Sequence, residues 1–375
     1  MANANQVALG RSNLSTGTGY GGANDKYALY LKLFSGEMFK GFQHETIARD
    51  LVTKRTLRNG KSLQFVYTGR MSSSFHTPGT PILGNSDKAP PVAEKTIVMD
   101  DLLISSAFVY DLDETLAHYE LRGEISKKIG YALAEKYDRL IFRSITRGAR
   151  SASPVSATNF AEPGGTQIRV GSTTNESDAF DAGALVNAFY DAAAALDEKG
   201  VSSDGRCAVL NPRQFYSLIQ NVGSNGLVNR DVQGDALQGG TGVIEIAGIH
   251  IYKSMNIPFL GKYGIKYGGT TGETSPGNLG DFIGPTPENA NATGGVNNDY
   301  GTNAELGAKS AGLIFQKEAA GVVEAIGPQV QVTNGDVSVI YQGDVILGRM
   351  AMGADYLNPA AAVELYVGTT APSAF

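Results

Sequence analysis

The spacing of hydrophobic positions changes along the chain and predicts distinct elements. After a polar stretch over 1–24, which is typical of a flexible arm, the period becomes helical. Apolar residues recur every three to four positions, at Leu29, Leu33, Phe34, Met38 and Phe42. A short amphipathic helix must bury its apolar stripe against another element. We therefore predict a flexible arm followed by a short amphipathic helix that packs on something outside itself.

Residues 56–110 predict a long two-stranded arm with an irregular tip. The run TLRNGKSLQFVYTGR places Asn59-Gly60 between two strand-like runs, which favours a tight hairpin turn. A proline-containing loop over 71–91 follows, and EKTIVMDDLLISSAFVY returns as strand. Because a two-stranded ribbon is marginally stable alone in water, we expect it to lie on another surface.

The longest periodic segment predicts a helix over 111–147. Asp111 can cap its start with Glu114 as the capping-box partner, and Gly148 is expected to end it. At about 1.5 Å per residue the helix would be on the order of 50 Å long. Three arginines step by four residues near its end, at Arg139, Arg143 and Arg147. They could contact nucleic acid or an acidic partner, but we favour complementation of the helix dipole and i,i+4 pairing.

Residues 177–329 predict a compact α/β domain. Ser177 is expected to cap an Ala-rich helix, RCAVLN predicts a short buried strand, and Asn211-Pro212 marks the start of another helix. The run GVIEIAGIHIYKS alternates as strands that are broken at Gly248. Residues 261–312 are rich in Gly, Thr, Asn and Pro and predict a long insertion. Residues 330–375 return to strand-like alternation.

Composition narrows the possible functions. Of the 375 residues, 42% are hydrophobic and 18% charged, which is typical of a folded protein, and the net charge of −6 disfavours tight wrapping of nucleic acid. The single cysteine, Cys207, excludes an intrachain disulfide, and the four histidines show no metal-ligand spacing. No apolar run suggests a membrane span, and MANANQVALG lacks signal-peptide features. A reducing cytoplasm is the simplest compartment.

The stretch YDLDETLAH raises one catalytic alternative. Asp111, Asp113 and Thr115 form D-x-D-x-T after an apolar run, a pattern similar to the nucleophile and general acid of haloacid-dehalogenase-like phosphatases. A helix that begins at Leu112 would point the two aspartates roughly 200° apart, at about 100° per residue. The helix-capping interpretation is therefore favoured over an Mg²⁺-dependent phosphatase that uses Asp111.

The order of these elements resembles that of tailed-phage major capsid proteins of the HK97 fold, and most of all those of T7-like podoviruses. The segments that carry the resemblance are LYLKLFSGEMFKGF (29–42), GKSLQFVYTGR (60–70), EKTIVMDDLLISSAFVYDLDETLAHYELRGEISKKIG (94–130) and AMGADYLNPAAAVELYVGTT (351–370). The resemblance covers nearly the whole chain, and 94–130 is its most specific part.

The resemblance implies an α+β, HK97-like fold in four parts. These are an N-terminal arm (1–55), an extended two-stranded E-loop (56–110), a peripheral domain (111–176 and 330–375) with a spine helix (111–147), and a compact axial domain (177–329) that carries the insertion.

It also implies a structural function without catalytic residues, metal or cofactor. Such a chain would self-assemble as hexamers and pentamers into an icosahedral shell around phage dsDNA, with a scaffolding protein and a portal protein as partners. Its inner face would touch the DNA weakly and non-specifically, and no membrane would be involved. The protein would be part of the virion capsid and would be assembled in the bacterial host cytoplasm. An encapsulin-like compartment is the alternative within the same fold.

The arm and the loop would cross adjacent subunits. The residues expected at intersubunit contacts are Phe34, Met38, Phe42, Phe65, Tyr67, Arg70, Arg139, Arg143 and Arg147.

Overall fold

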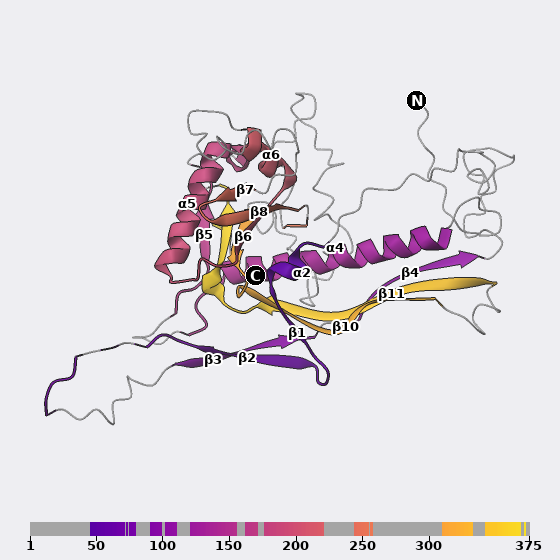
Figure 1. The fold of residues 1–375 in the computed structure, drawn as a ribbon, viewed down its shortest axis with the longest axis horizontal. Coiled ribbons are helices and arrows are strands. Elements are labelled where there is room, and N and C mark those ends of the chain that lie inside the picture. The colour runs from indigo at the N-terminus through magenta and orange to yellow at the C-terminus, as the bar shows by residue number, and fades with distance from the viewer. Residues whose placement is uncertain are drawn as a thin grey trace. The chain divides into compact units, whose positions relative to one another are not determined.

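A computed structural model of the chain contains two sheets, a two-stranded ribbon and three longer helices among the residues that it describes (Figure 1). These residues are 46–71, 73, 75–79, 91–99, 102–110, 121–155, 162–171, 176–220, 244–254, 256–257, 310–332, 342–368 and 371–372. They fall into two compact units. One unit contains 102–135 and 326–352, and the other contains 46–99, 136–325 and 353–372.

The first unit is organised around the long strand β11 (Gly343–Tyr356). Its neighbour β4 (Leu103–Tyr110) pairs with it antiparallel, from Leu103 opposite Met350 to Tyr110 opposite Gly343. The complete four-stranded sheet has the order β1-β10-β11-β4. Buried and half-buried residues alternate along β11 because one face of the strand is covered and the other is not.

The helix α4 (Leu121–Ala149) covers one face of β11 in the first unit. The glycine at 348 allows this close approach, because a Cβ there would overlap Ile129 and lie 3.0 Å from Leu133 Cδ1. The predicted start of this helix, with Asp111, lies outside the described residues. The predicted stop at Gly148 is wrong, because the helix continues to Ala149.

Gly148 has a packing role instead of a capping role. A Cβ at this position would lie 2.9 Å from Tyr356 Cβ and 3.7 Å from Ala362 Cβ. The absence of a side chain therefore lets the end of α4 approach the end of β11 within the second unit.

The second unit contains a six-stranded sheet with the order β5-β12-β9-β6-β8-β7. Its strands are β5 (Thr166–Arg169), β6 (Arg206–Leu210), β7 (Ile244–Ile246), β8 (Ile249–Lys253), β9 (Ser310–Gln316) and β12 (Ala362–Tyr366). The β5/β12 and β6/β8 pairs are parallel, and the other pairs are antiparallel. Every residue of β6 and β9 is buried, so these two strands lie in the core. The boundaries predicted at 177 and 330 do not coincide with this sheet, since β5 and β12 belong to it.

Two helices contact this sheet, α5 (Ala182–Glu198) with β5 and α6 (Pro212–Gln220) with β8. The predicted cap of the Ala-rich helix at Ser177 is wrong. The 3₁₀ turn η3 (Glu176–Phe180) comes first, and Asp181 caps α5 by accepting a hydrogen bond from Gly183 N at 3.1 Å. The sequence therefore contained two residues suited to an N-cap, and the later one is used.

The predicted helix start at Asn211-Pro212 is confirmed. Asn211 Oδ1 accepts from Arg213 N at 3.1 Å, and Gln214 Oε1 accepts from Asn211 N at 3.1 Å, which completes a reciprocal capping box. The predicted break at Gly248 is also confirmed. Ala247 and Gly248 have φ values of 53° and 74°, as a type I′ turn between β7 and β8 requires.

The ribbon consists of β2 (Ser62–Thr68) and β3 (Val92–Val98), which pair antiparallel over their whole length. The predicted hairpin at Asn59-Gly60 is wrong, although Gly60 has a positive φ of 102°. The strand before this turn, β1 (Thr53–Thr56), pairs in parallel with β10 (Ala320–Val332), so the turn connects two different sheets. Two short elements complete the unit, α2 (Ala48–Leu51) and η5 (Pro359–Ala361).

Candidate intersubunit surfaces

The two faces of the β2–β3 ribbon have different environments, because successive side chains of a strand point to opposite faces. The inner ribbon face consists of Leu63, Phe65, Tyr67, Ala93, Lys95 and Ile97, which are buried or half-buried. The outer ribbon face carries the exposed hydrophobic residues Val66, Val92 and Val98 among the polar residues Ser62, Gln64, Thr68, Glu94 and Thr96. The inner face is therefore engaged within the chain, whereas most outward side chains of the ribbon are exposed among the residues that the structure describes.

An apolar cluster holds the base of the inner ribbon face. Leu57, Ile97 and Val323 are buried in it, with Leu63, Phe65, Met99 and Leu357 packed against them. Phe65, predicted at an intersubunit contact, thus contributes to the core of its own subunit. A buried side chain of this size contributes about 1.5–3 kcal/mol to folding.

Residues 355–358 form the surface on which the inner ribbon face packs, and we call this surface the ribbon seat. Three of these four residues make polar contacts with the ribbon. Lys95 Nζ lies 2.8 Å from Asp355 Oδ2 and 3.6 Å from the centroid of the Tyr356 ring. Tyr67 donates its hydroxyl hydrogen to Asn358 Oδ1 at 3.1 Å. Burial, with the nearby charge of Glu162, raises the pKa of Tyr67, so the hydroxyl remains a donor at neutral pH.

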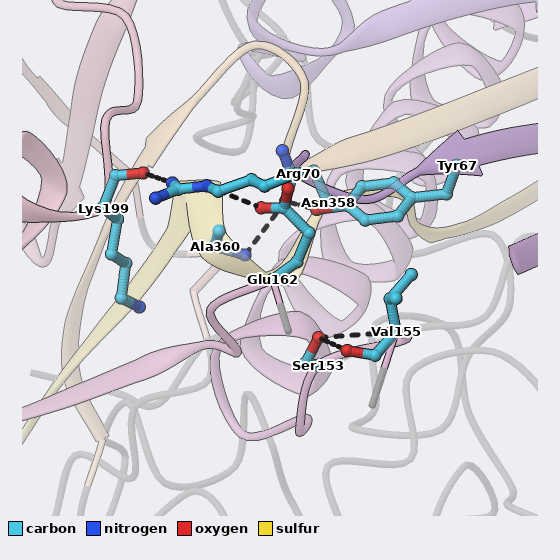
Figure 2. Close-up of polar contacts among 8 residues, drawn as sticks. All are labelled: Tyr67, Arg70, Ser153, Val155, Glu162, Lys199, Asn358 and Ala360. Carbon is cyan, nitrogen blue, oxygen red and sulfur yellow. Dashed lines mark hydrogen bonds and ion pairs between the residues drawn. The ribbon is translucent and has the colours of Figure 1, made fainter. Parts of the chain in front are cut away.

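Arg70, just before the tip of the ribbon, contacts Glu162 and Lys199 and so holds the ribbon in place (Figure 2). Its Nε lies 3.3 Å from Glu162 Oε2, and its Nη2 donates to the backbone oxygen of Lys199. The side chain of Arg70 is half exposed, so this ion pair contributes at most about 1 kcal/mol. Burial lowers the pKa of Lys199 to about 8, and its amine donates to Gly164 O and Thr166 Oγ1.

The remaining predicted contact residues have varied positions. Arg139 and Arg143 are half-buried on α4 and interact with other groups. Arg147 is exposed, with its guanidinium carbon 5.9 Å from the centroid of the Tyr356 ring. Phe34, Met38 and Phe42 lie outside the described residues. The structure thus places Tyr67 against Asn358 of the ribbon seat, Arg70 against Glu162 and Lys199, and Arg147 near the same Tyr356 ring as Lys95.

The first described residues of the chain are anchored on α4 by two neighbouring side chains. The buried carboxylate of Asp138 accepts from Ile47 N at 2.9 Å, Ala48 N at 3.2 Å and Thr46 Oγ1, and Asn256 Nδ2 lies 3.4 Å away. Burial raises the pKa of Asp138, while these hydrogen bonds act in the opposite direction.

The adjacent Tyr137 reaches a second buried carboxylate, that of Glu324 on β10. Glu324 accepts from the Tyr137 hydroxyl at 2.8 Å and pairs with Lys54 at 2.7 Å and Arg49 at 3.3 Å. Although burial favours the neutral form, the hydrogen bonds from Lys54, Tyr137 and Arg49 hold the pKa of Glu324 below its usual value. Together the two carboxylates fix 46–54 to α4 and β10.

The outer ribbon face was missed by sequence reasoning, which selected Phe65 and Tyr67 on the opposite face. The alternation of side chains along β2 could have identified this face. Phe65 and Tyr67 share a face with Leu63, whereas Val66 points the other way. An exposed aliphatic row on a strand is more informative than a large aromatic residue, because the large residue is often part of the core.

The described residues provide no catalytic constellation. Asp111 and Asp113 lie outside them, and among the residues described no three His, Cys, Asp or Glu side chains gather as a metal site. Burial raises the pKa of the Cys207 thiol to about 12, which makes it a poor nucleophile. Within the described ranges, no helix combines the length and the apolar character needed to cross a membrane.

The family model described as "Gp10A-like: Major capsid protein" matches residues 64–366. Because this match spans most of the chain, the chain belongs to this family of major capsid proteins. It is a family of structural proteins that form the phage capsid, so the phosphatase alternative is not supported.

Two curated relatives agree with this assignment. The major capsid protein of Escherichia phage T7 is 26% identical over 357 residues, which cover 92% of this chain and 94% of that protein. The major capsid protein of Enterobacteria phage T3 is 31% identical over 139 residues, which cover 36% of this chain and 39% of that protein.

Solved structures of phage capsids have a similar fold. The capsid structure of cyanophage P-SCSP1u has a TM-score of 0.67 and 31% sequence identity, and the comparison covers 98% of this chain and 100% of that one. The mature capsid of bacteriophage PhiM1 has a TM-score of 0.64 at 13% identity, covering 91% of this chain and 92% of that one. The mixed architecture of helices and sheets is consistent with the HK97-like fold that the sequence predicted.

Proposed function

We propose that copies of this chain assemble as hexamers and pentamers into a closed icosahedral shell that encloses the dsDNA genome of a phage. The observation that carries this proposal is the likeness to the cyanophage capsid structure, which extends over nearly the whole of both chains. Repeated heterologous contacts around rings are the physical route from a single chain to a closed shell.

The four parts predicted from the sequence are part of this proposal. The β2–β3 ribbon supports an extended loop within 56–110, and the 29-residue helix α4 supports a spine helix within 111–147. The six-stranded sheet with α5 and α6 supports an axial domain over 177–329, to which we add β5 and β12 because they are strands of that sheet. The peripheral domain then takes in most of 111–176 and 330–375. The insertion 261–312 lies almost entirely outside the described residues.

Contacts between neighbouring subunits would come from the arm and the ribbon. We assign the arm contacts to Phe34, Met38 and Phe42. On the ribbon we assign them to the outer face, because Phe65 and Tyr67 already contact their own subunit. The half-exposed Arg70 and the exposed Arg147 remain candidates for polar contacts, and Arg139 and Arg143 are weaker candidates because they are half-buried.

The proposed partners follow from the same function. A scaffolding protein would guide assembly, a portal protein would occupy one vertex, and the DNA would contact the inner face weakly. The net charge of −6 is consistent with a wall that does not bind packaged DNA tightly. Assembly would take place in the cytoplasm of the bacterial host.

Co-expression with the scaffolding protein of the same phage, followed by sedimentation and negative-stain microscopy, tests the proposal. We expect particles far larger than a single ring of subunits. A chain that remains monomeric at every concentration and scaffold ratio would contradict it. Nuclease-protected DNA in particles from infected cells would support a virion shell, whereas a packaged enzyme would indicate an encapsulin-like compartment.

A further inference from the structure

The strand β4 forms one edge of the four-stranded sheet, and this edge lacks the usual protection against pairing. Among the described strands, β4 pairs with β11 on one side and with no strand on the other. Its sequence LISSAFVY contains no charged residue and no proline, and its register with β11 is continuous over eight residues. Proteins normally protect an edge strand with charge, proline, a bulge or short length. The free edge of β4 is therefore suited to pairing with another strand.

The other edge strands of the two larger sheets differ from β4. At the opposite end of the same sheet, β1 carries Lys54 and Arg55. The two ends of the six-stranded sheet, β5 and β7, are four and three residues long and carry Arg169 and Glu245. Of these four described edge strands, β4 is thus the longest and the only one without a charged residue.

The side chains of β4 are complementary to a second copy of the same strand. Ile104, Ser106 and Phe108 point to the exposed face, and Ile104 and Phe108 are 51% and 46% exposed. Residues that lie directly opposite each other in an antiparallel pair share a face. If two copies of β4 pair around Ser106, Ile104 of one copy lies opposite Phe108 of the other, and Leu102 lies opposite Tyr110. Each of these pairs joins an aliphatic and an aromatic side chain, which favours cross-strand pairing.

The charge distribution also favours this register. Two copies of net charge −6 repel each other, so a neutral edge is where their backbones can approach with least repulsion. On β11, Arg349 lies opposite Ile104, and Val345 lies opposite Phe108. In the register centred on Ser106, the row that contains Arg349 of one copy therefore ends at Val345 of the other copy. The two arginines are kept at opposite ends of the joined face.

The size of the edge indicates what kind of partner it fits. An eight-residue strand is about 26 Å long, at about 3.3 Å per residue. One strand pair of this length is smaller than the roughly 1,200 Å² interface that holds two free proteins together. It fits copies that other contacts already hold close to each other. Rings of subunits use heterologous contacts, whereas a closed icosahedral shell also contains twofold axes, at which the same patch of two subunits meets.

We propose that β4 of one copy pairs antiparallel with β4 of a second copy across a local twofold axis centred on Ser106, and that this contact joins neighbouring rings of the shell. The inference rests on the proposed function, in which many copies of the chain form rings within a shell. The two four-stranded sheets would become one continuous sheet. Ile104 and Phe108 of both copies would then cover one another on its exposed face.

Opposite charges at the centre of the pairing test the twofold contact. Ser106→Lys and Ser106→Glu each place two like charges together, so each variant alone is expected to lower the yield of shells roughly tenfold or more. An equal mixture of the two variants can place lysine opposite glutamate and is expected to recover most of the yield. Ser106→Thr is the neutral control and should assemble normally. Thermal unfolding of the unassembled subunits controls for folding. Normal assembly of either charged variant alone, or no recovery in the mixture, would overturn the pairing.

Crosslinking tests the same contact independently of charge. In the proposed register, the two copies of Ser106 are direct neighbours, whereas the two copies of Leu102 are about 26 Å apart. Shells of Ser106→Cys treated with a short bis-maleimide are therefore expected to contain crosslinked dimers, and shells of the matched control Leu102→Cys are expected to contain far fewer. Cys207 is buried and should not react.

The outcomes separate this contact from the shell function itself. Well-formed shells of Ser106→Cys without dimers, a crosslink to the scaffolding protein only, or equal crosslinking of the two variants would overturn the inference and leave the shell function intact. Failure of the wild-type chain to form shells would instead refute the proposed function.

Discussion

At the scale of single residues, the described core contains a fully buried ion pair. Arg150 donates to Glu364 through Nε at 2.7 Å and through Nη2 at 2.5 Å, and neither side chain is accessible to solvent. Gln167 donates a third hydrogen bond to Glu364 at 3.0 Å. The pair joins the end of α4 to β12, so its integrity matters for the second unit.

Glu364→Gln removes the buried carboxylate charge to which Arg150 donates two hydrogen bonds. We expect it to lower the free energy of unfolding by about 3–5 kcal/mol, measured by urea denaturation of the unassembled subunit. Asp197→Asn is the control, because Asp197 pairs with Arg206 at 2.7 Å while the Asp197 side chain is 68% exposed. Although Arg206 is buried, it keeps its hydrogen bonds to Ser202 O and Val201 O, so this variant should lose less stability than Glu364→Gln. Equal losses in the two variants would contradict the account.

Glu324 gives the stability of the subunit a defined dependence on pH. Its pKa is lower in the folded chain than in the unfolded chain, despite burial, because Lys54, Tyr137 and Arg49 donate to it. The unfolded chain therefore binds more protons between the two pKa values, so this stabilisation is complete above the unfolded pKa and is lost as pH falls through the folded pKa.

Glu324→Gln should consequently reduce stability more at pH 7 than at pH values below the folded pKa. Urea denaturation of both proteins across the acidic range measures the difference. Asp138, whose pKa is raised by burial, is present in both proteins and does not affect the comparison. A loss that is independent of pH would show that Glu324 does not carry this charge effect.

The structural role of a residue could be predicted where that role depends on its neighbours in the sequence. The cap at Asn211 was predictable because a cap depends on neighbouring residues, and Asp181 competed with Ser177 for the same role. The partners of Asp138 and Glu324 could not be predicted. Thr46, which donates to Asp138, and Tyr137, which donates to Glu324, are each distant in sequence from the carboxylate that they contact. Nothing in the local pattern indicates which carboxylate will be buried with which donor.

At the scale of elements, the contact between α4 and β11 depends on a glycine. Gly348→Ala would place a methyl group against Ile129 and Leu133, so we expect a loss of about 1–3 kcal/mol from overpacking. Gly130→Ala on the exposed side of α4 meets nothing within 4 Å and should stabilise the helix by about 1 kcal/mol. Thermal unfolding of the two variants measures both effects. A Gly348→Ala variant at least as stable as the wild type would contradict this packing.

The strands and helices could be predicted better than their pairing. Periodicity indicated a ribbon and a long helix because each is encoded by neighbouring residues. The parallel pairing of β1 with β10 was missed, since the Asn59-Gly60 turn suggested a local hairpin and Thr53 pairs with the distant Gly321. Parity along β2 would have shown that Phe65 and Tyr67 face inward with Leu63.

At the scale of the whole molecule, the chain contains surfaces that its own described residues do not cover. Val66, Val92 and Val98 on the outer ribbon face and Ile104 and Phe108 on β4 are exposed hydrophobic side chains, and exposed hydrophobic side chains that lie together often mark an interaction site. Membership of the major capsid protein family gives these surfaces a purpose, because subunits of a shell cover one another. The sequence indicated this family through 94–130 and other segments, whereas the two surfaces became apparent only from the structure.

Cryo-electron microscopy of particles assembled from this chain with its scaffolding protein tests the central claim most directly. We expect a closed icosahedral shell in which rings of five copies occupy vertices, rings of six copies lie between them, and every ribbon rests on a neighbouring subunit. Particles without such rings, or a preparation that contains only monomers and irregular aggregates, would contradict the claim.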